Sequence, residues 1–354
     1  MTNELTNVDD LEAVVGARTD AGTYKSIPIL DPHCDTMLGL SPLSFLGHVT
    51  SDDTLATVVL GGAPGHASAA SPTELAMPGL DATGLVDGTP VGLLTLIPGY
   101  GETLRVNGRL SLAGDTPTIA VEEAFVHCAK AIIRSKLWKA DGEARGAWDQ
   151  VDELRGGAEL LDDAAVGAFL AASPFVTLAS VDGDGKADVS PKGDPIGFVH
   201  VLDADALHGR RLAVPDRPGN LRTDTLHNLL DRPELSLVAL VPGSDHVLTV
   251  SGRATTTDDE SIRAALVANG KVPLAAVVIE VAEVVLRRES AIGASSVWDR
   301  SLHVEPGALP RASQIWSDHV QIHAGLSTED EEQRLIPVDA MHDGIQQNYR
   351  DGLY

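Results

Sequence analysis

Two stretches of the sequence decide the fold: LLTLIPGYGETLRVNGR at residues 93–109 and LVALVPGSDHVLTVSGR at residues 237–253. They align without a gap at an offset of 144 residues. Each contains an apolar strand, a Pro-Gly turn and an alternating second strand that ends in Gly-Arg, a pattern that predicts a β-hairpin. Because the hairpin occurs twice, we interpret the chain as containing a repeated unit.

Two further matches lie in the same order along the chain. VEEAFVHCAKAIIRSKLW at 121–138 pairs with VAEVVLRRESAIGASSVW at 281–298, at an offset of 160 residues. A weaker match places SFLGHVTSDDTLATVVLGG, from Ser44, over PFVTLASVDGDGKADVSPK, from Pro174, and so aligns Gly62 with Lys192. Three collinear matches predict a tandem duplication.

The repeated unit consists of short predicted strands separated by Gly, Asp and Pro turns, which is typical of a small antiparallel barrel. Helical periodicity is confined to residues 158–172, 223–230 and parts of the C-terminal region. We therefore predict a mainly β (α+β) protein with two tandem barrels packed as an intramolecular pseudo-dimer. The predicted divisions are an N-terminal unit at 25–140, a linker at 141–157, a C-terminal unit at 158–300 and a helical tail at 301–354, which packs over the barrels or caps a site.

Composition limits the classes of function. The formal net charge of -25 argues against nucleic-acid binding and against attraction to anionic membranes, because both use a basic surface. Any anionic ligand must be held by a local cluster of cations. No apolar run is long enough for a membrane span and residues 1–16 lack a signal-peptide core, which predicts a cytoplasmic protein. Cys34 and Cys128 have no metal-binding or disulfide spacing, so no metal is predicted.

The second copy carries a family resemblance. SPKGDP at 190–195, AVPDRPGNLRTDTLHNLL at 213–230 and LVPGSDHVLTVSGR at 240–253 resemble the flavin-binding split-barrel proteins similar to pyridoxamine 5'-phosphate oxidase. In the first copy, GETLRVNGR and EEAFVHCAKAIIRSKLW resemble later parts of the same pattern. The resemblance implies two split β-barrels, and a site in which FMN lies at the barrel interface with its phosphate held by one unit and its ring edge touched by the other.

The second copy keeps the groups that the resemblance assigns to the phosphate. Lys192 follows a predicted strand, and PDRPGNLR contains cations around a Pro-Gly turn whose backbone N–H groups can face an anion. Forked arginine donors and a lysine point charge suit a phosphate dianion. The predicted cofactor-binding residues of this copy are Ser190, Lys192, Asp216, Arg217, Asn220, Arg222 and Asn228.

The first copy has lost these groups and keeps a different set. LAMPGLDATGLVDG replaces the arginine-containing segment with fewer residues and no arginine. In return, the first copy has Arg105, His127, Lys130, Arg134 and Lys136 where the second has Thr249, Arg287, Ser290, Ala294 and Ser296. Complementary loss predicts one composite site, in which the second barrel holds the phosphate and the first supplies the facing wall through Arg105, His127, Lys130 and Arg134.

Each assignment on the phosphate side has an alternative. Arg217 and Arg222 can form surface ion pairs with Asp216 and Asp224, which contribute little energy. Asp216 can act by orienting Arg217. A turn or cap role is the alternative for Ser190, Asn220 and Asn228.

The facing wall also has alternatives. His127 can hydrogen-bond the flavin or a substrate, ligate a haem iron, or lie at a domain interface. Lys130 and Arg134 can offset the acidic surface without touching a cofactor. PHCDT at 32–36 places His, Cys and Asp close together, but no second cluster in the sequence completes a metal site, and we interpret it as a loop.

The sequence thus predicts an FMN-dependent oxidoreductase with one flavin per chain, acting on a small molecule that the sequence does not identify. Pyridoxamine phosphate oxidase activity itself is not expected, because the substrate-binding Arg and His tail of that enzyme is not recognisable in DHVQIHAGLSTEDEEQ. One alternative keeps the fold and exchanges the cofactor for a deazaflavin or a haem with His127, His303, His319 or His323 as axial ligand. Another is a non-catalytic flavin carrier. The oligomeric state stays open.

Overall fold

The computed structural model describes residues 3–18, 23–139, 143–205, 208–220, 222–305, 307–330 and 333–354. The N-terminal half forms a seven-stranded antiparallel sheet. In spatial order its strands are β2 (Leu55–Gly61), β1 (Leu43–Val49), β5 (Pro90–Leu96), β6 (Thr103–Ser111), β7 (Thr118–His127), β4 (Glu74–Ala76) and β3 (Ser68–Ser71).

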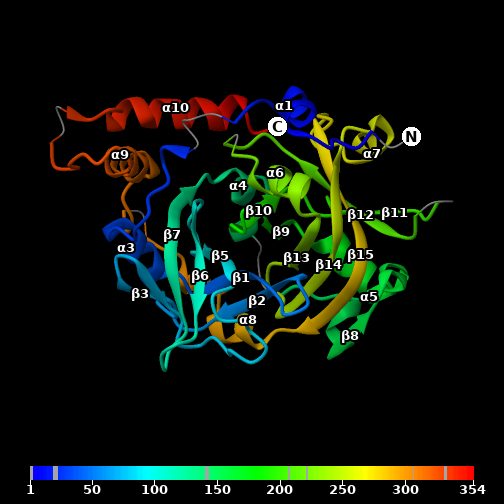
Figure 1. Cartoon of the computed structure of the whole chain (residues 1–354). Coiled ribbons are helices and arrows are strands. Elements are labelled where there is room, and N and C mark those ends of the chain that lie inside the picture. Colours follow the sequence, from blue (N-terminus) through cyan, green and yellow to red (C-terminus); the bar gives the residue numbers. More distant parts are fainter. Residues whose placement is uncertain are drawn as a thin grey trace.

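The C-terminal half forms a second antiparallel sheet with the same strand order, and the two sheets lie side by side (Figure 1). Its strands are β10 (Ala187–Gly193), β9 (Phe175–Val181), β13 (Glu234–Leu240), β14 (His246–Thr257), β15 (Ala275–Arg288), β12 (Arg211–Asp216) and β11 (His200–Leu202). An additional strand, β8 (Glu153–Gly156), pairs with β15. The predicted fold class, mainly β with two similar units, is confirmed.

The strand pairings agree with two of the three repeat alignments, those at offsets of 144 and 160 residues. The long hairpins carry the same β-bulge, between Asn107 and Gly108 in β6 and between Ser251 and Gly252 in β14. A bulge is a local irregularity that fixes the register of the strands around it. Its recurrence at the offset of 144 residues shows that the two hairpins are structural equivalents.

The third repeat alignment was wrong by two residues. Ser41 in the first unit and Ser173 in the second make the same pair of hydrogen bonds. Each hydroxyl donates to one backbone carbonyl oxygen in the strand that follows the serine and to another in the neighbouring strand. This correspondence aligns Lys192 with Leu60 and not with Gly62. A shift of two residues keeps every side chain on its face of the sheet, so the apolar pattern could not reveal it.

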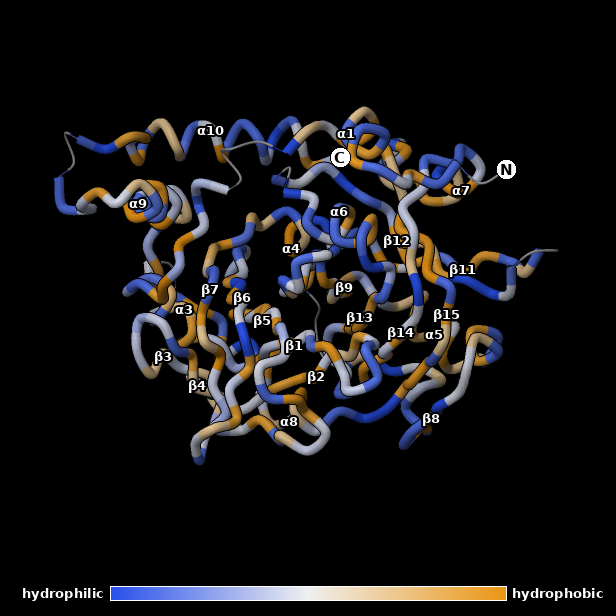
Figure 2. The backbone as a smooth tube through the Cα atoms, viewed as in Figure 1, coloured by the Kyte–Doolittle hydropathy of each residue, from blue (hydrophilic) through white to orange (hydrophobic). Residues whose placement is uncertain are grey.

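Each unit has its own apolar core, and a third cluster joins them. Phe45 and Leu94 of the first unit pack in one cluster with Phe175 and Val238 of the second. Figure 2 shows apolar segments on the strands of both sheets where they face one another. The pseudo-dimer is therefore held by a shared core and not only by surface contacts.

Two short helices lock the units together in equivalent ways. Helix α4 (Lys130–Ser135) of the first unit contacts β10 of the second, and α8 (Ser290–Ser295) of the second contacts β2 of the first. A Cβ atom on Gly193 would overlap the carbonyl oxygen of Ala131, and one on Gly61 would overlap that of Ala291. Glycine at the end of each edge strand therefore permits the close approach of the opposite helix.

The remaining helices border the sheets, and two of them correct the sequence analysis. The predicted helix at 158–172 is split, because the Asp163 side chain accepts from the backbone N–H groups of Ala165 and Val166 and so caps a new helix. The segment PHCDT, predicted to be a loop, begins a helix. The remaining α-helices are α1 (Val8–Val15), α3 (Pro32–Leu40), α5 (Ala164–Ala172), α6 (Asp224–Asp231), α7 (Glu260–Ala265), α9 (Ala312–His323) and α10 (Val338–Asp351).

The predicted linker at 141–157 begins at residues outside the described ranges, and its described part is structured. Trp148 is buried and packs edge-on against Phe169, and β8 extends the second sheet. The tail forms α9 beside β7, followed by α10 along the edge of the molecule where α1 also lies (Figure 1). Among the described residues, no helix has the length and apolar character needed to cross a membrane.

We predict that Gly193→Ala and Gly61→Ala each destabilise the fold, by about 1–3 kcal/mol, because the added methyl group meets rigid backbone. The measurement is urea-induced unfolding of each variant. Gly167→Ala in α5 is the matched control: a Cβ there meets nothing within 4 Å, and alanine favours a helix by up to about 1 kcal/mol. Equal stability of the Gly193 variant and the control would contradict the close helix contact.

Candidate functional site

A pocket of about 170 Å³ lies between the two units. Its wall contains ten of the eleven residues that the sequence predicted for the cofactor. From the first unit come Arg105, His127, Lys130 and Arg134, and from the second come Ser190, Lys192, Asp216, Arg217, Asn220 and Arg222. The structure therefore brings the two predicted half-sites together, although the role of each residue stays a prediction.

The second unit builds its wall from two strand ends and a turn. Ser190 and Lys192 lie within β10, which continues through Pro191 although Lys192 was expected to follow the strand. Proline is tolerated there because β10 is an edge strand. β12 ends at Asp216, and the chain turns through Pro218 and Gly219 before α6 begins.

The first unit contributes adjacent strands and the helix after them. Arg105 lies in β6, and His127 ends the neighbouring strand β7. Helix α4 follows directly and carries Lys130 and Arg134. Side chains of this unit and of the β12–α6 turn thus face the same pocket.

A buried cluster of charged side chains joins the units beside the pocket. Arg105, with a side chain only 1% exposed, forms ion pairs with Asp188 of β10 and Asp224 of α6. Arg222 pairs with Asp224 at 2.8 Å and reaches back to Glu123 of β7 at 2.9 Å. We call these five residues the interface charge cluster.

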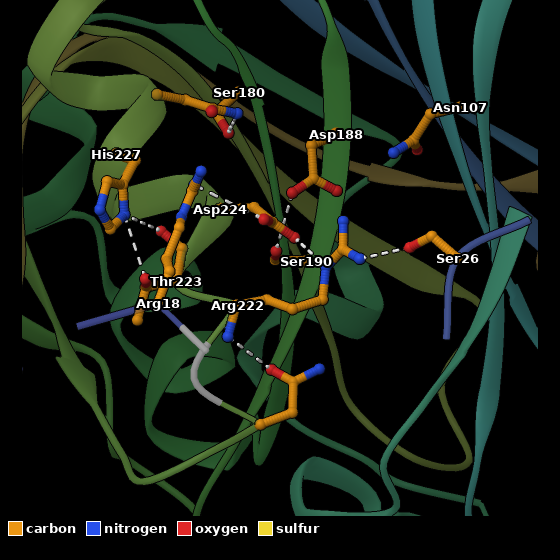
Figure 3. Close-up of polar contacts among 12 residues, drawn as sticks. Arg18, Ser26, Asn107, Ser180, Asp188, Ser190, Arg222, Thr223, Asp224 and His227 are labelled. Atoms are coloured by element: carbon orange, nitrogen blue, oxygen red, sulfur yellow. Dashed lines mark hydrogen bonds and ion pairs between the residues drawn. The ribbon is translucent and has the colours of Figure 1, made fainter. Parts of the chain in front are cut away.

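Figure 3 shows the second-unit side of this cluster, with Arg222 extending toward Ser26 and Asp188 beside Ser190. Arg222 donates to Ser26 Oγ at 2.6 Å. One arginine from each unit also lies near the same aromatic ring: the guanidinium carbons of Arg222 and Arg105 are 3.8 and 4.6 Å from the centre of the Phe125 ring. Aromatic faces attract cations, most strongly where water is excluded.

The cluster changes the proton affinities of its members. Burial lowers the pKa of Arg105 to about 10, against the attraction of Asp224. Burial would raise the pKa of Asp224, but Arg222 and Arg105 outweigh it and hold this pKa at about 2. Both groups are therefore charged at neutral pH, and Asp224 is the carboxylate that the two arginines share.

Two other cations of the pocket wall, Lys192 and Arg217, have partners that the sequence analysis did not expect. Lys192 pairs with Asp216 at 2.6 Å. Arg217 pairs with Asp194, also at 2.6 Å, and donates to the carbonyl oxygens of Leu266 and Lys271. The expectation that Asp216 orients Arg217 was therefore wrong. These pairs are partly or fully buried and are not the surface ion pairs of the alternative interpretation.

Helix α4 clamps the β12–α6 turn. Lys130 donates to the carbonyl oxygen of Gly219 at 3.3 Å, and Arg134 donates to that of Pro218 at 3.1 Å. Arg134 also donates to the carbonyl oxygens of Gly193 and Leu353. The last residues of the chain thus brace the same helix that forms the first-unit wall.

Several polar atoms of the pocket wall have no hydrogen-bond partner within the described part of the protein. Thr225 is 2% exposed and its Oγ1 is unpartnered, as is the buried Nδ1 of His127. Burial and the nearby Arg105 cation hold the pKa of His127 well below its usual range, so the imidazole is neutral. Because buried polar atoms are nearly always satisfied, these atoms mark positions at which a bound molecule can donate or accept.

The other predicted polar residues have local partners. The Oδ1 atom of Asn220 accepts from the backbone N–H of Arg222, which is a turn contact. Ser190 Oγ donates to Asp188 at 3.4 Å. Asn228 does not line the 170 Å³ pocket: its amide donates to Ser180 within the second unit.

A larger pocket of about 620 Å³ adjoins the first. The two share Arg222 and Asp224 in their walls, and Asn228 belongs to the larger one. Its wall also includes Arg18 and Ser26 from the N-terminal segment and His323 at the end of α9. The tail therefore borders this pocket through His323. The expectation that it caps a functional site stays a prediction.

Sequence reasoning missed most of the carboxylates of the site. Asp224 was named as a possible ion-pair partner of Arg222, and that pair is present although it is largely buried. Glu123, Asp188 and Asp194 also hold the cations in place, yet acidic residues are so common in this chain that these three gave no signal. Asp188 and Asp194 flank the SPKG motif, and that position is the one feature that could have identified them. Thr225, two residues beyond the turn, was also missed.

The interpretation of PHCDT as a loop was wrong, and its Cys34 lies in a buried group of potential metal ligands. Asp31 caps α3, Cys34 lies in its first turn, and His319 of α9 meets both. Their potential ligand atoms all lie within 4.8 Å of one another, and all three residues are buried. The partner residue lies 285 positions away from Cys34, which is why spacing within the sequence could not reveal it.

Comparison with known proteins concerns mainly the second unit. Residues 162–292 match the family described as pyridoxamine 5'-phosphate oxidase. This part of the chain is therefore similar to the pyridoxamine 5'-phosphate oxidase-like split barrels. It includes the whole β10 to α6 wall and the hairpin that follows. No curated protein matches the chain. The tandem duplication is not addressed by these matches and stays a prediction.

Three similar solved structures each cover about a third of the chain. A putative pyridoxamine 5'-phosphate oxidase from Lactobacillus delbrueckii has 26% identity, covers 31% of this chain and 82% of its own, and has a TM-score of 0.24. HupZ of Group A Streptococcus has 16% identity, covers 30% and 80%, and has a TM-score of 0.25. HutZ of Vibrio cholerae, described as a heme storage protein, has 12% identity, covers 36% and 97%, and has a TM-score of 0.24.

The interface charge cluster predicts a specific response to acid. A carboxylate whose pKa is lowered on folding stabilises the protein above its unfolded pKa, about 3.9, and this contribution is lost as the pH falls through its folded pKa. For Asp224 that window runs from about pH 4 to pH 2 and involves about 2 kcal/mol. We expect Asp224→Asn to reduce the decline in the free energy of unfolding across this window.

Urea unfolding at a series of pH values measures this decline. Part of it persists in the variant, because Asp31 also has a pKa of about 2. Asp184→Asn, in an exposed turn of the same unit, is the control and should follow the wild-type curve. Parallel curves for wild type and Asp224→Asn would contradict the assignment of Asp224 as the carboxylate shared by two arginines.

Proposed function

We propose that the chain binds one FMN between its two units and uses it for a two-electron redox reaction on a small molecule. The observation that carries this proposal is the charge of the pocket. In a protein with a formal net charge of -25, the wall of the 170 Å³ pocket includes six cations and only two carboxylates, Asp216 and Asp224. Three further carboxylates outside this wall, Asp188, Asp194 and Glu123, pair with Arg105, Arg217 and Arg222. The remaining positive charge comes from Lys130 and Arg134, which donate to carbonyl oxygens. A positive pocket in an acidic protein favours the binding of an anion.

The residues present fit a flavin nucleotide. Arginine and lysine donors suit the phosphate, and the unpartnered Thr225 Oγ1 and His127 Nδ1 can meet polar atoms of the ribityl chain or the ring. The 170 Å³ pocket alone is smaller than the roughly 300–1,000 Å³ of typical ligand sites. A flavin therefore has to extend past Arg222 into the adjoining 620 Å³ pocket, or displace side chains of the wall.

The two units would have different tasks. Lys192, Arg217, Asn220 and Arg222 of the second unit would hold the phosphate, and a phosphate there competes with Asp216 for Lys192. The first unit would cover the flavin with the wall described above. A neutral His127 can donate or accept one hydrogen bond without adding charge beside the ring.

The bound flavin supplies the redox chemistry, because its ring accepts and returns a hydride equivalent. The protein places the ring, excludes water and sets the surrounding charge. Two hydroxyl groups of the pocket wall, those of Ser190 and Thr223, are hydrogen-bonded to Asp188 and His227. The proposal assigns them no catalytic role, because the flavin carries the reaction. The first-unit segment 77–89, which has no helix where the second unit has α6, leaves only one cradle of this type.

Flavin stoichiometry tests the composite site. We expect apoprotein titrated with FMN to bind one equivalent per chain, measured by quenching of flavin fluorescence. Two equivalents would show that each unit binds on its own and would contradict the proposal.

Lys192→Met should weaken FMN binding by about tenfold or more, because a charge-assisted hydrogen bond to a partly buried anion contributes roughly 1.5–3 kcal/mol. Arg253→Met is the matched control, since it removes one cation from the same unit at a side chain that is 66% exposed. Riboflavin, which lacks the phosphate, should bind both variants equally. Equal FMN affinity of the Lys192 and Arg253 variants would refute the phosphate assignment.

A haem-binding function is the second candidate, and one observation favours it. His323 lines the 620 Å³ pocket, and its Nδ1 lies 2.8 Å from the carbonyl oxygen of Ser26. A histidine whose Nδ1–H donates to a carbonyl presents Nε2 as a metal ligand. His319 has a similar Nδ1 contact with the Lys25 carbonyl, but it is fully buried and does not line this pocket, so it is not the better axial ligand for a haem there.

Absorption spectra separate the two candidates. If the protein binds haem through His323, added hemin gives a Soret band that shifts in His323→Ala and not in His303→Ala. If it binds flavin, the quenching of FMN fluorescence on binding is the same for wild type and His323→Ala. Added hemin then gives only the spectrum of unspecific adsorption, and this spectrum is the same for both histidine variants.

A further inference from the structure

We infer that Asp31, Cys34 and His319 form a binding site for a zinc-like divalent metal ion that fastens the C-terminal tail to the first unit. This inference is independent of the cofactor. The three residues are 5%, 0% and 0% exposed and come from both sides of the junction between α3 and α9. Their potential ligand atoms lie within 4.8 Å of one another.

The orientation of His319 points to a cation. Its Nδ1 lies 3.2 Å from the carbonyl oxygen of Lys25, an acceptor, so Nδ1 carries a proton. Its Nε2 lies 3.3 Å from Oδ2 of Asp31 and has no hydrogen bond of acceptable geometry to any described residue. In the neutral imidazole this Nε2 carries a lone pair, and that lone pair faces a carboxylate oxygen. Only a second proton or a metal ion between the two atoms removes that repulsion.

The other two residues leave suitable atoms free. Asp31 uses Oδ1 to accept the backbone N–H of Cys34 at 2.8 Å, which caps α3 and leaves Oδ2 directed at His319. Cys34 has no disulfide. Imidazole nitrogen, thiolate sulfur and carboxylate oxygen are the three ligand types that zinc takes in proteins, at bond lengths of about 2.0–2.3 Å.

The distances suit such an ion. Ligand atoms around a tetrahedral zinc lie roughly 3.5 Å apart, given these bond lengths. The Nε2 to Oδ2 distance of 3.3 Å already matches, and the upper limit of 4.8 Å requires only a small adjustment of a side chain. The carbonyl of Lys25 then acts as the outer partner that orients the histidine, an arrangement typical of metal-binding histidines.

Neighbouring polar residues do not compete for the ion. His33 pairs with Asp318 at 2.7 Å, and Asp318 also binds Arg334 and Gln314. Burial and the charge of Asp31 raise the pKa of the Cys34 thiol. Metal binding would therefore release the thiol proton to solvent as the sulfur–metal bond forms, with no change of oxidation state.

A metal ion here would connect distant parts of the chain. Four residues beyond His319, α9 reaches His323, which borders the 620 Å³ pocket. Fastening α9 to α3 thus fixes one wall of that pocket. With three protein ligands, a water molecule would take the fourth position of a tetrahedral ion. Because none of the three residues lines either pocket, we assign the ion a structural role and not a catalytic one.

Metal analysis of the full chain tests the site. We expect the wild-type protein, incubated with a slight excess of Zn²⁺ and then desalted, to retain one zinc per chain. Cys34→Ser and His319→Gln should lose at least about 90% of it. Cys128→Ser, which changes the other buried cysteine, is the matched control and should retain one equivalent.

Cobalt provides a readout that does not depend on variants folding. Co²⁺ added to wild-type protein should give tetrahedral visible bands and a thiolate charge-transfer band, and Zn²⁺ should displace both. Absence of retained zinc together with an octahedral, thiolate-free Co²⁺ spectrum would overturn the inference and identify the pair as an imidazolium–carboxylate contact. Removal of the metal by a chelator should leave FMN binding unchanged. That result would show that the metal site and the flavin site can be tested independently.

Discussion

The interface charge cluster is the constraint on which the rest of the structure depends. Arg105 of the first unit is completely surrounded by protein, and its partners Asp188 and Asp224 belong to the second unit. A buried guanidinium without a carboxylate is costly by several kcal/mol, because its lost hydration is not replaced. Neither unit can therefore bury its share of the cluster alone, and the two sheets have to meet at this place.

The meeting of the units also locates the pocket. Asp224 begins α6, and α6 follows the turn that carries the predicted phosphate ligands. Helix α4 of the first unit holds the same turn through its backbone carbonyl groups. The cations of the pocket are thus fixed by contacts that cross the interface. An anion bound there would interact with side chains of both units.

The sequence predicted those parts of the fold that local chemistry determines. The paired hairpins were recognisable because Pro-Gly turns and alternating strands repeat at a constant offset, and the shared bulge at Gly108 and Gly252 agrees with this. The weaker repeat was misaligned by two residues, since a two-residue shift preserves the alternation of a strand. The break at Asp163 was missed because an N-cap inside an apolar pattern looks like any other polar position.

The cations of the candidate site were predictable, but of their carboxylate partners only Asp224, beside Arg222, was named from the sequence. Lys192, Arg217 and Arg222 stand out in an acidic chain, whereas the carboxylates that hold them do not. Which carboxylate meets Arg217 depends on the path of β10, so Asp194 could not be preferred over Asp216 from the sequence. Likewise, only the packing of α9 against α3 brings His319 to Cys34.

The most direct measurement of the central claim is a double-mutant cycle across the interface. The free energy of unfolding would be determined for wild type, Arg105→Met, Asp188→Asn and the double variant. If the buried pair joins the two units, the double variant is more stable than the sum of the single effects implies, with a coupling energy of about 1–3 kcal/mol. Additivity within about 0.5 kcal/mol would mean that the pair does not hold the units together, and would contradict the account.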